Sequence, residues 1–82
     1  MWYVYILECK DGTLYTGITT DLSRRFSEHQ QGVGSHYTRA HGAERIVHSE
    51  KYTNRSHASK REREIKGWSR EKKRELYEPP SA

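Results

Sequence analysis

Two stretches of this chain decide its fold: WYVYILE at residues 2–8 and LYTGI at residues 14–18. Both are rich in the aromatic and β-branched residues that favour strands. Between them lies Asp11-Gly12, a dipeptide typical of hairpin turns. The sequence therefore predicts a β-hairpin over residues 2–18. Gly17, inside the second strand, indicates a bulge or a close approach of the backbone to another group.

The residues after the hairpin predict one more strand and three helices. The strand is expected over residues 44–49, and the helices from 21 to about 30, from about 55 onward, and from 70 to near Tyr77. The candidate capping residues are Thr20 or Asp21, Asn54 or Ser56, and Ser69. Residues 32–42 carry three glycines and are expected to form a loop. The order β-β-α-β-α-α indicates an α+β fold, with helices packed on a small sheet.

Length and composition set limits on the kind of protein. We expect one domain over residues 1–78 and a short tail at 79–82, since 82 residues leave room for one small core. The single cysteine, Cys9, forms no internal disulfide and fits a reducing compartment. No apolar run approaches the ~18–20 residues of a membrane span, and the N-terminus does not resemble a signal peptide. These features predict a cytoplasmic protein with no membrane partner.

The positive charge is concentrated near the C-terminus. Residues 1–59 hold seven Lys or Arg against six Asp or Glu, whereas residues 60–82 hold eight against five, for a total of +4. Such a stretch indicates a polyanionic partner, although a solvated helix with Glu–Arg pairs has the same composition. The candidate nucleic-acid-binding residues are Lys60, Arg61, Arg63, Lys66, Arg70, Lys72 and Lys73.

Two charged residues break the amphipathic pattern of the predicted helices. Helical spacing places Arg25 in the stripe of Leu22 and His29, and Glu62 in the stripe of Ala58 and Ile65. A buried charge is costly, so each needs a partner or a cleft. One interpretation is a direct Arg25–Glu62 salt bridge. The other is a cleft in which Glu62 holds a cation and Arg25 faces an anionic substrate group.

The hairpin adds two tyrosines to this set. Tyr5 and Tyr15 share one face if the register of the hairpin allows it. Strand tyrosines are often core residues, but a phenol hydroxyl also binds phosphate oxygens or a water nucleophile. Together with Arg25, His29 and Glu62, they make a set suited to phosphodiester chemistry.

These residues resemble the GIY-YIG nuclease superfamily, and most closely its small stand-alone bacterial members. The resemblance rests on Tyr3-Val4-Tyr5, Tyr15-Thr16-Gly17, Arg25, His29 and Glu62, with the Tyr37-Thr38 and 61–66 segments in support. It covers residues 2–76. It implies a three-stranded antiparallel sheet flanked by helices, endonuclease activity on DNA, and one Mg²⁺ ion, with Mn²⁺ as a substitute. No organic cofactor is implied.

By position, the resemblance assigns roles to single residues. Tyr5 and Tyr15 match the motif tyrosines, Arg25 the catalytic arginine and Glu62 the metal ligand. Tyr37 would help Tyr15 to orient the phosphate or the water, and Gly17 would let the backbone approach closely. Either Tyr5 or His29 would deprotonate water: the ordinary pKa of histidine favours His29, and the family favours tyrosine.

Two other interpretations compete with a nuclease. The first is a module that grips nucleic acid through the Lys60–Arg74 stretch without cutting it. The second is a zinc site built from His29, His36, His41 and Cys9, whose spacing matches no common zinc pattern. The sequence leaves open whether DNA or RNA is bound, whether it is single-stranded, duplex or branched, and which oligomer forms.

Overall fold

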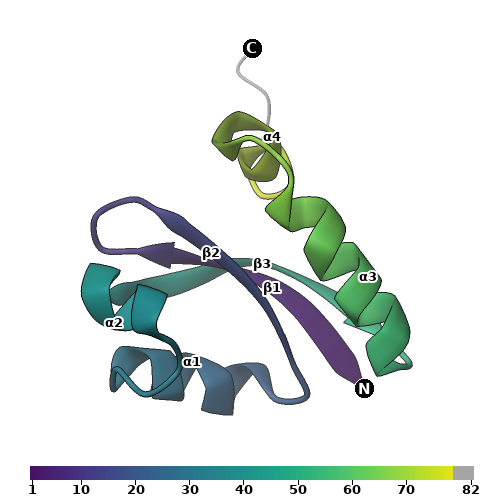
Figure 1. Ribbon diagram of the computed structural model, residues 1–82, viewed down its shortest axis with the longest axis horizontal. Helices are drawn as coiled ribbons and strands as arrows, with labels where there is room; N and C mark the ends of the chain where they lie inside the picture. Colours follow the sequence, from purple (N-terminus) through teal and green to yellow (C-terminus); the bar gives the residue numbers. More distant parts are fainter. Residues whose placement is uncertain (79–82) are drawn as a thin grey trace.

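A computed structural model describes residues 1–78 of the chain, and the tail at 79–82 lies outside the described residues. Its elements, labelled in Figure 1, follow the order β-β-α-α-β-α-α. They are β1 (Trp2–Cys9), β2 (Leu14–Thr19), α1 (Leu22–Gln30), α2 (His36–His41), β3 (Ala43–Tyr52), α3 (Arg55–Lys66) and α4 (Arg70–Arg74). In the described part, no helix is long and apolar enough to cross a membrane.

The three strands form one antiparallel sheet in the order β2-β1-β3. This confirms the predicted hairpin and the predicted α+β fold. The pairing of β1 with β2 is regular and sets Tyr5 opposite Gly17 and Leu7 opposite Tyr15. Directly paired residues share a face of the sheet, so Tyr5 and Tyr15 lie on the same face, as the nuclease interpretation required. The irregularities of register lie instead between β1 and β3.

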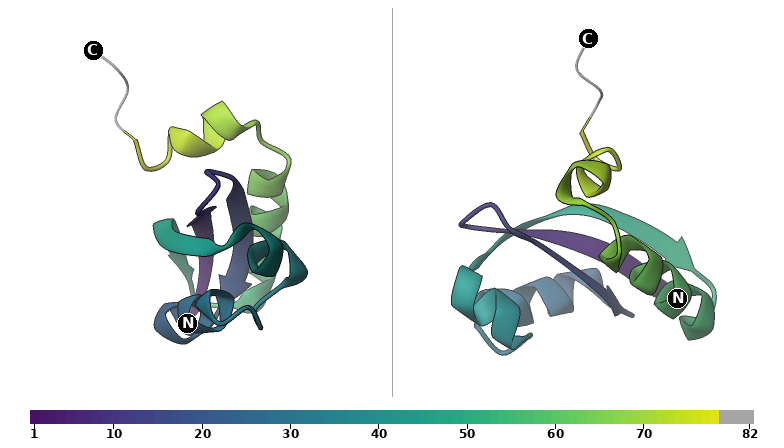
Figure 2. Two further views of the ribbon diagram at one scale, coloured as in Figure 1. Left: turned by 90° about the vertical axis from the view of Figure 1, so that its left-hand side faces the viewer. Right: turned by 45° about the horizontal axis from the view of Figure 1, so that its top comes forward.

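Each face of the sheet carries its own core, because alternate residues of the central strand point to opposite sides. Val4 and Ile6 pack with Ala58 and Ile65 of α3. Tyr5, Leu7 and Cys9 pack on the other face, where Leu22 and Phe26 of α1 cover them. Figures 1 and 2 show α1 and α3 on opposite sides of the sheet. The α1 face, which buries a tyrosine hydroxyl, is the more polar of the two.

The caps of the predicted helices are found where the sequence places them. Asp21, Asn54 and Ser69 each accept a hydrogen bond from the backbone N–H three residues on, at the start of α1, α3 and α4. The third strand is longer than predicted, since β3 extends from Ala43 to Tyr52. The last helix is shorter, because α4 ends at Arg74 and turns follow to Tyr77.

The expected loop over residues 32–42 is wrong in its second half, which forms α2. Ser35 caps this helix by accepting a hydrogen bond from the Thr38 N–H. Gly42 ends it with a backbone φ of 79°, a conformation that favours glycine. Both signals are in the sequence, but a helix of six residues has too few apolar positions to show the hydrophobic period of a helix.

Candidate active site

Tyr5 lies at the centre of the site, on the middle strand and fully buried. Its ring passes over Gly17 of β2: a Cβ added to Gly17 would lie 2.6 Å from the Tyr5 hydroxyl oxygen and 2.8 Å from Cζ. The absence of a side chain at Gly17 therefore makes room for the phenol of Tyr5. Of the two alternatives predicted at Gly17, the structure has the close approach and not the bulge, since the β1–β2 register is regular there.

His29 connects the first helix to this tyrosine. A hydrogen bond of 2.8 Å joins the Tyr5 hydroxyl to His29 Nε2. The ring centroid of His29 lies 5.9 Å from that of Tyr5 and 5.1 Å from that of Tyr15, and the two tyrosine rings are 6.3 Å apart. Three of the predicted site residues thus meet in one cluster, although they come from β1, β2 and α1.

Burial sets the protonation of this cluster. Desolvation raises the pKa of Tyr5 to about 12, against the opposing effect of the nearby Arg25 guanidinium. Desolvation and the charge of Arg25 both lower the pKa of His29. At neutral pH the tyrosine is therefore a neutral phenol and the histidine a neutral imidazole, whose ring has one nitrogen free to accept a proton. A phenol with this pKa is a poor base unless its own proton has somewhere to go.

Arg25 is held beside the cluster by two contacts. Its Nη2 donates to the carbonyl of Gly34 at 2.7 Å, and its Nη1 donates to Glu28 at 3.1 Å. The side chain keeps 27% of its surface exposed. The guanidinium is thus positioned by the backbone and still open to an anionic group from outside, as the cleft interpretation requires.

Of the two interpretations of the inward charges, the direct Arg25–Glu62 salt bridge is not formed within the described residues. Arg25 pairs with Glu28, and the Glu62 carboxylate lies 3.6 Å from Lys66 Nζ. Glu62 is 20% exposed, and its charge is close enough to raise the pKa of Tyr5. The two inward charges therefore do not pair with each other, and both act on the pKa of Tyr5.

Thr38 is a site residue that periodicity did not single out, because it lies on the unpredicted helix α2. It is buried, and its Oγ1 lies 2.6 Å from His29 Nδ1 and 3.0 Å from Ser35 Oγ. The Tyr5 hydroxyl, His29 and Thr38 form one continuous hydrogen-bonded chain. The signal that could have found it is the spacing of the Ser35 cap, which places Thr38 on the first turn of a helix.

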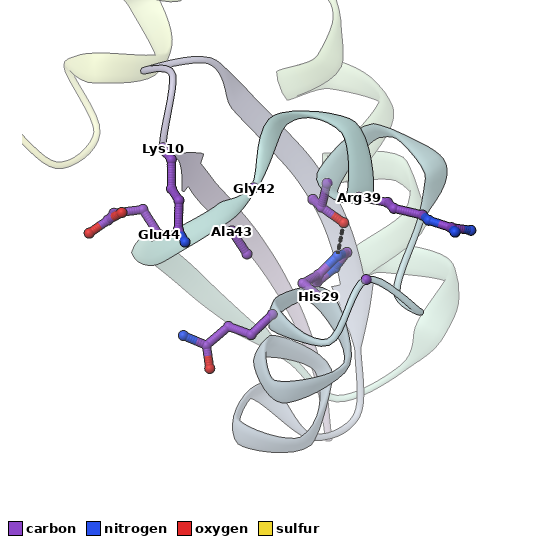
Figure 3. Close-up of a pocket in the computed structure, with 9 residues that line it drawn as sticks. Lys10, His29, Arg39, Gly42, Ala43 and Glu44 are labelled. Atoms are coloured by element: carbon purple, nitrogen blue, oxygen red, sulfur yellow. Dashed lines mark hydrogen bonds between the residues drawn. The ribbon is translucent and has the colours of Figure 1, made fainter.

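A pocket of about 330 Å³ lies behind His29, on the Thr38 side. Figure 3 shows His29 and Thr38 joined at its inner end, while Arg39 extends away from them. Lys10, in the turn after β1, and Glu44 of β3 line another part of it. The imidazole thus has Tyr5 at one nitrogen and a polar pocket near the other.

Tyr37 extends the aromatic cluster to the surface. Its ring centroid lies 5.8 Å from that of Tyr15 and 4.4 Å from that of His41, and it is 37% exposed. His41 in turn pairs with the Asp11 carboxylate in the hairpin turn. The rings of Tyr5, Tyr15 and Tyr37 therefore lead from the buried phenol outward to solvent.

Glu62 is the residue that would hold a metal ion. Its carboxylate offers the hard oxygen donors that Mg²⁺ prefers, and it is partly exposed. Within residues 1–78, no group of three or more His, Cys, Asp or Glu is arranged to hold a metal. The zinc interpretation is contradicted, because Cys9 and His29 are buried and both ring nitrogens of His29 are hydrogen-bonded, to Tyr5 and to Thr38.

The seven candidate basic residues differ in the groups that they contact. Arg61 donates to Glu50 and Glu64, and Lys66 pairs with Glu62. Lys72 lies over the ring of Trp68, 4.5 Å from its centroid. The remaining four divide between two pockets, with Lys60 and Arg63 on α3 and Arg70 and Lys73 on α4.

The comparison with known families agrees with this geometry. The family model described as the GIY-YIG catalytic domain matches residues 1–75. The chain belongs to the GIY-YIG family. Within it, the similar proteins are small ones: a UPF0213 protein of Haloquadratum walsbyi is 53% identical over 76 residues, which cover 93% of this chain and 85% of that protein.

A solved GIY-YIG relative has the same fold. The solution NMR structure of a UPF0213 protein from Bacillus halodurans is 48% identical and superposes with a TM-score of 0.57, covering 93% of this chain and 82% of that one. A UPF0213 protein of Natronomonas pharaonis is 50% identical over 74 residues, or 90% of this chain and 87% of its own length. The domain is thus of the nuclease type, and these names specify neither a substrate nor a metal.

Proposed function

We propose that this protein is a divalent-metal-dependent endonuclease that hydrolyses phosphodiester bonds in DNA, in single-stranded or branched form. The observation that carries the proposal is the Tyr5–His29 hydrogen bond of 2.8 Å, flanked by a partly exposed Arg25 and a partly exposed Glu62. An acceptor for a proton, a cation for a phosphate and a carboxylate for a metal lie around one phenol. This is the set of groups that phosphodiester hydrolysis needs.

In this mechanism, Tyr5 and His29 act together as the general base. The Tyr5 hydroxyl takes the proton of the attacking water while its own proton moves to His29 Nε2, so no free tyrosinate has to form. The raised pKa of Tyr5 then ceases to be an obstacle, because the neutral imidazole accepts the proton across a hydrogen bond that already exists. Both of the residues that the sequence offered as the base are thereby used.

The other side chains bind and orient the phosphate. Arg25 neutralises the charge that develops on the phosphate oxygens, because its guanidinium is fixed by the Gly34 carbonyl and Glu28. Tyr15 and Tyr37 position the phosphate or the water. Glu62 would hold a Mg²⁺ or Mn²⁺ ion, which would supply polarisation of the phosphate and stabilisation of the leaving oxygen. The single buried thiol, Cys9, favours a cytoplasmic location.

One observation favours a second candidate, a nucleic-acid-binding module without catalysis. Tyr5 and His29 are 0% and 1% exposed, so water reaches the Tyr5 hydroxyl only if the side chains around it move. A module would need only the basic residues and the exposed tyrosine. The two functions differ in whether the buried phenol is ever used.

The test is Glu62→Gln, with Glu64→Gln as the matched control on the same helix. Glu64 is 54% exposed and pairs with Arg61, away from Tyr5. We expect cleavage of single-stranded and branched DNA that depends on Mg²⁺, lost at least about 100-fold in Glu62→Gln and kept in Glu64→Gln, with both variants equally folded by circular dichroism. Salt-sensitive binding with no cleavage in wild type would establish the module. Equal activity in both variants would remove Glu62 from the mechanism.

A further inference from the structure

A second pocket lies beside the exposed end of the tyrosine cluster. It has a volume of about 220 Å³ and is lined by Thr13 and Leu14 of the hairpin, Tyr37 of α2, and Arg70 and Lys73 of α4. Three segments that are far apart in the sequence therefore meet here. Figure 2 shows α4 lying above the turn between β1 and β2. The Arg70 guanidinium comes close to that turn, 3.4 Å from where a Cβ of Gly12 would lie.

The lining of this pocket combines two kinds of chemistry. Arg70 and Lys73 contribute two positive charges, and no acidic residue lines the pocket. Leu14 and the ring of Tyr37 contribute an apolar and aromatic surface. The nearest carboxylate in the turn, Asp11, is already engaged by Thr13 and His41. The pocket thus presents cations beside a flat aromatic side chain, which is the complement of a nucleotide: a phosphate joined to a planar base.

The two cations are available to such a ligand. Within residues 1–78, neither Arg70 nor Lys73 lies within 4.0 Å of a carboxylate oxygen, in contrast to Arg61, Lys66 and Arg74. Lys73 is half-buried, and burial together with the charge of Lys66 lowers its pKa. An anion stabilises a half-buried ammonium that has no carboxylate partner more than it stabilises an ammonium that is exposed or already paired.

The position of the pocket relates it to the reacting phosphate. Tyr37 contacts Tyr15, whose ring lies 5.8 Å away, and Tyr15 lies 6.3 Å from Tyr5. One ring, that of Tyr15, thus connects Tyr37 to the buried Tyr5. A strand whose scissile phosphate lies at Tyr5 and Arg25 would therefore carry a neighbouring nucleotide past Tyr37.

We propose that Tyr37, Arg70 and Lys73 form a subsite for one nucleotide next to the scissile phosphate, in which the two cations bind a flanking phosphate and Tyr37 contacts its base. This inference rests on the proposed function, since it takes the reacting phosphate to lie at Tyr5. It assigns α4 to substrate binding. It also separates Arg70 and Lys73 from Lys60 and Arg63, whose pocket on α3 includes an acidic residue, Glu64, and no aromatic one except His57.

The test compares two strands that carry the same charge. Fluorescein-labelled dT10 and a ten-residue abasic strand are titrated with the full chain in EDTA, so that cleavage plays no part. We expect wild type to bind dT10 about tenfold tighter than the abasic strand, because stacking adds to the phosphate contacts. Arg70→Gln/Lys73→Gln should weaken both strands at least about tenfold and reduce the salt slope by about 0.7, for the one flanking phosphate that is no longer neutralised on a single strand.

Two further variants complete the design. Lys60→Gln/Arg63→Gln removes the same charge from α3 and is expected to weaken binding less. Tyr37→Leu keeps an apolar side chain and is expected to remove most of the preference for dT10 over the abasic strand. Thermal unfolding of each variant confirms that it is folded.

The outcomes separate the subsite from the proposed function. If wild type binds neither strand, both proposals fail. If it binds dT10 but the α3 and α4 double variants weaken binding equally, the subsite is overturned and the proposed function stands. If Tyr37→Leu keeps the full preference for dT10, the pocket binds phosphate only and the nucleotide assignment is overturned. Displacement of dT10 by an equal concentration of thymidine monophosphate would overturn the assignment to a strand.

Discussion

Gly17→Ala is the substitution whose effect the structure specifies most closely. The added Cβ would lie 2.6 Å from the Tyr5 hydroxyl oxygen, 2.8 Å from Tyr5 Cζ and 3.2 Å from Tyr15 Cε1. Carbon atoms in ordinary contact lie ~3.5–4.0 Å apart, so the phenol has to move by about 1 Å. Tyr5 is fully buried and held by His29, which leaves it little freedom to move.

The expected cost follows from these contacts. Overpacking a core position costs about 1–3 kcal/mol, and replacing glycine by alanine returns about 0.4–1 kcal/mol through the entropy of the unfolded chain. We expect a net loss of about 1–2 kcal/mol in the free energy of unfolding. In a domain of this size, that lowers Tm by roughly 5–15 °C. Nuclease activity should fall with it, because the Tyr5–His29 hydrogen bond is disturbed.

Gly67→Ala is the matched control for this measurement. Gly67 has a backbone φ of −81°, and the nearest atom to its added Cβ is the Glu64 carbonyl oxygen at 3.5 Å. The same chemical change therefore meets no obstacle there, and Tm should stay the same or rise by a few degrees. Thermal unfolding followed by circular dichroism compares the two variants. If Gly17→Ala proves as stable as Gly67→Ala, the phenol is not confined as described and the reasoning is refuted.

Two further predictions concern the polar networks. Thr38→Val should cost about 1–3 kcal/mol of unfolding free energy and shift the pH–rate profile, because His29 Nδ1 loses its partner at 2.6 Å. Thr38→Ser keeps a hydroxyl at this position and should keep both the stability and the pH–rate profile of wild type. Unchanged His29 tautomer populations by ¹⁵N NMR in Thr38→Val would contradict this. In acid, the stability due to His29, whose folded pKa is lowered, is present above its ordinary pKa of 6.5 and lost below it. Glu50 hydrogen-bonds to Arg61, and its pKa falls from 4.5 to about 2, so its contribution of about 2–3 kcal/mol is present above 4.5 and lost toward 2. Urea unfolding at pH 7, 5 and 3 should show both losses, and Glu50→Gln only the first; an identical acid loss in Glu50→Gln would exclude Glu50.

The sheet and three of its helices were predictable because their signals are local. The alternation of residues 2–8, the Asp11-Gly12 turn and the caps at Asp21, Asn54 and Ser69 each act within a few residues of their position. The helix α2 was not predicted, since six residues between two glycine-rich turns hold no amphipathic period. Its Ser35 cap is a local signal, but a weak one without the contacts that α2 makes to His29.

The candidate site was predictable in its members but not in their connections. Helical spacing brought Arg25 and His29 to one face of α1, yet it could not show that His29 binds Tyr5 while Arg25 binds the Gly34 carbonyl. These contacts depend on how the segment after α1, which contains Gly34, packs against that helix. A Cβ on Gly34 would lie 2.5 Å from His29 Nδ1, so the backbone passes the imidazole only because this residue is glycine. The periodicity of the sequence does not predict such a close approach of the backbone to a side chain.

The burial of Tyr5 and His29 also explains why one small domain can hold a stable fold and a reactive site together. On the α3 face, the apolar core consists of Val4, Ile6, Ala58 and Ile65, and it has no part in the proposed reaction. On the α1 face, the polar groups satisfy one another through Tyr5, His29 and Thr38, so they contribute to stability while the protein is free. In the proposed function, substrate would bind at Arg25 and Tyr37, whose side chains are partly exposed. Tyr15 packs against Tyr5, and the exposed Tyr37 packs against Tyr15, so a strand bound at Tyr37 would act on the ring that covers the phenol. Access of water to Tyr5 is therefore expected to depend on the substrate, which ties hydrolysis to the presence of a correctly placed strand.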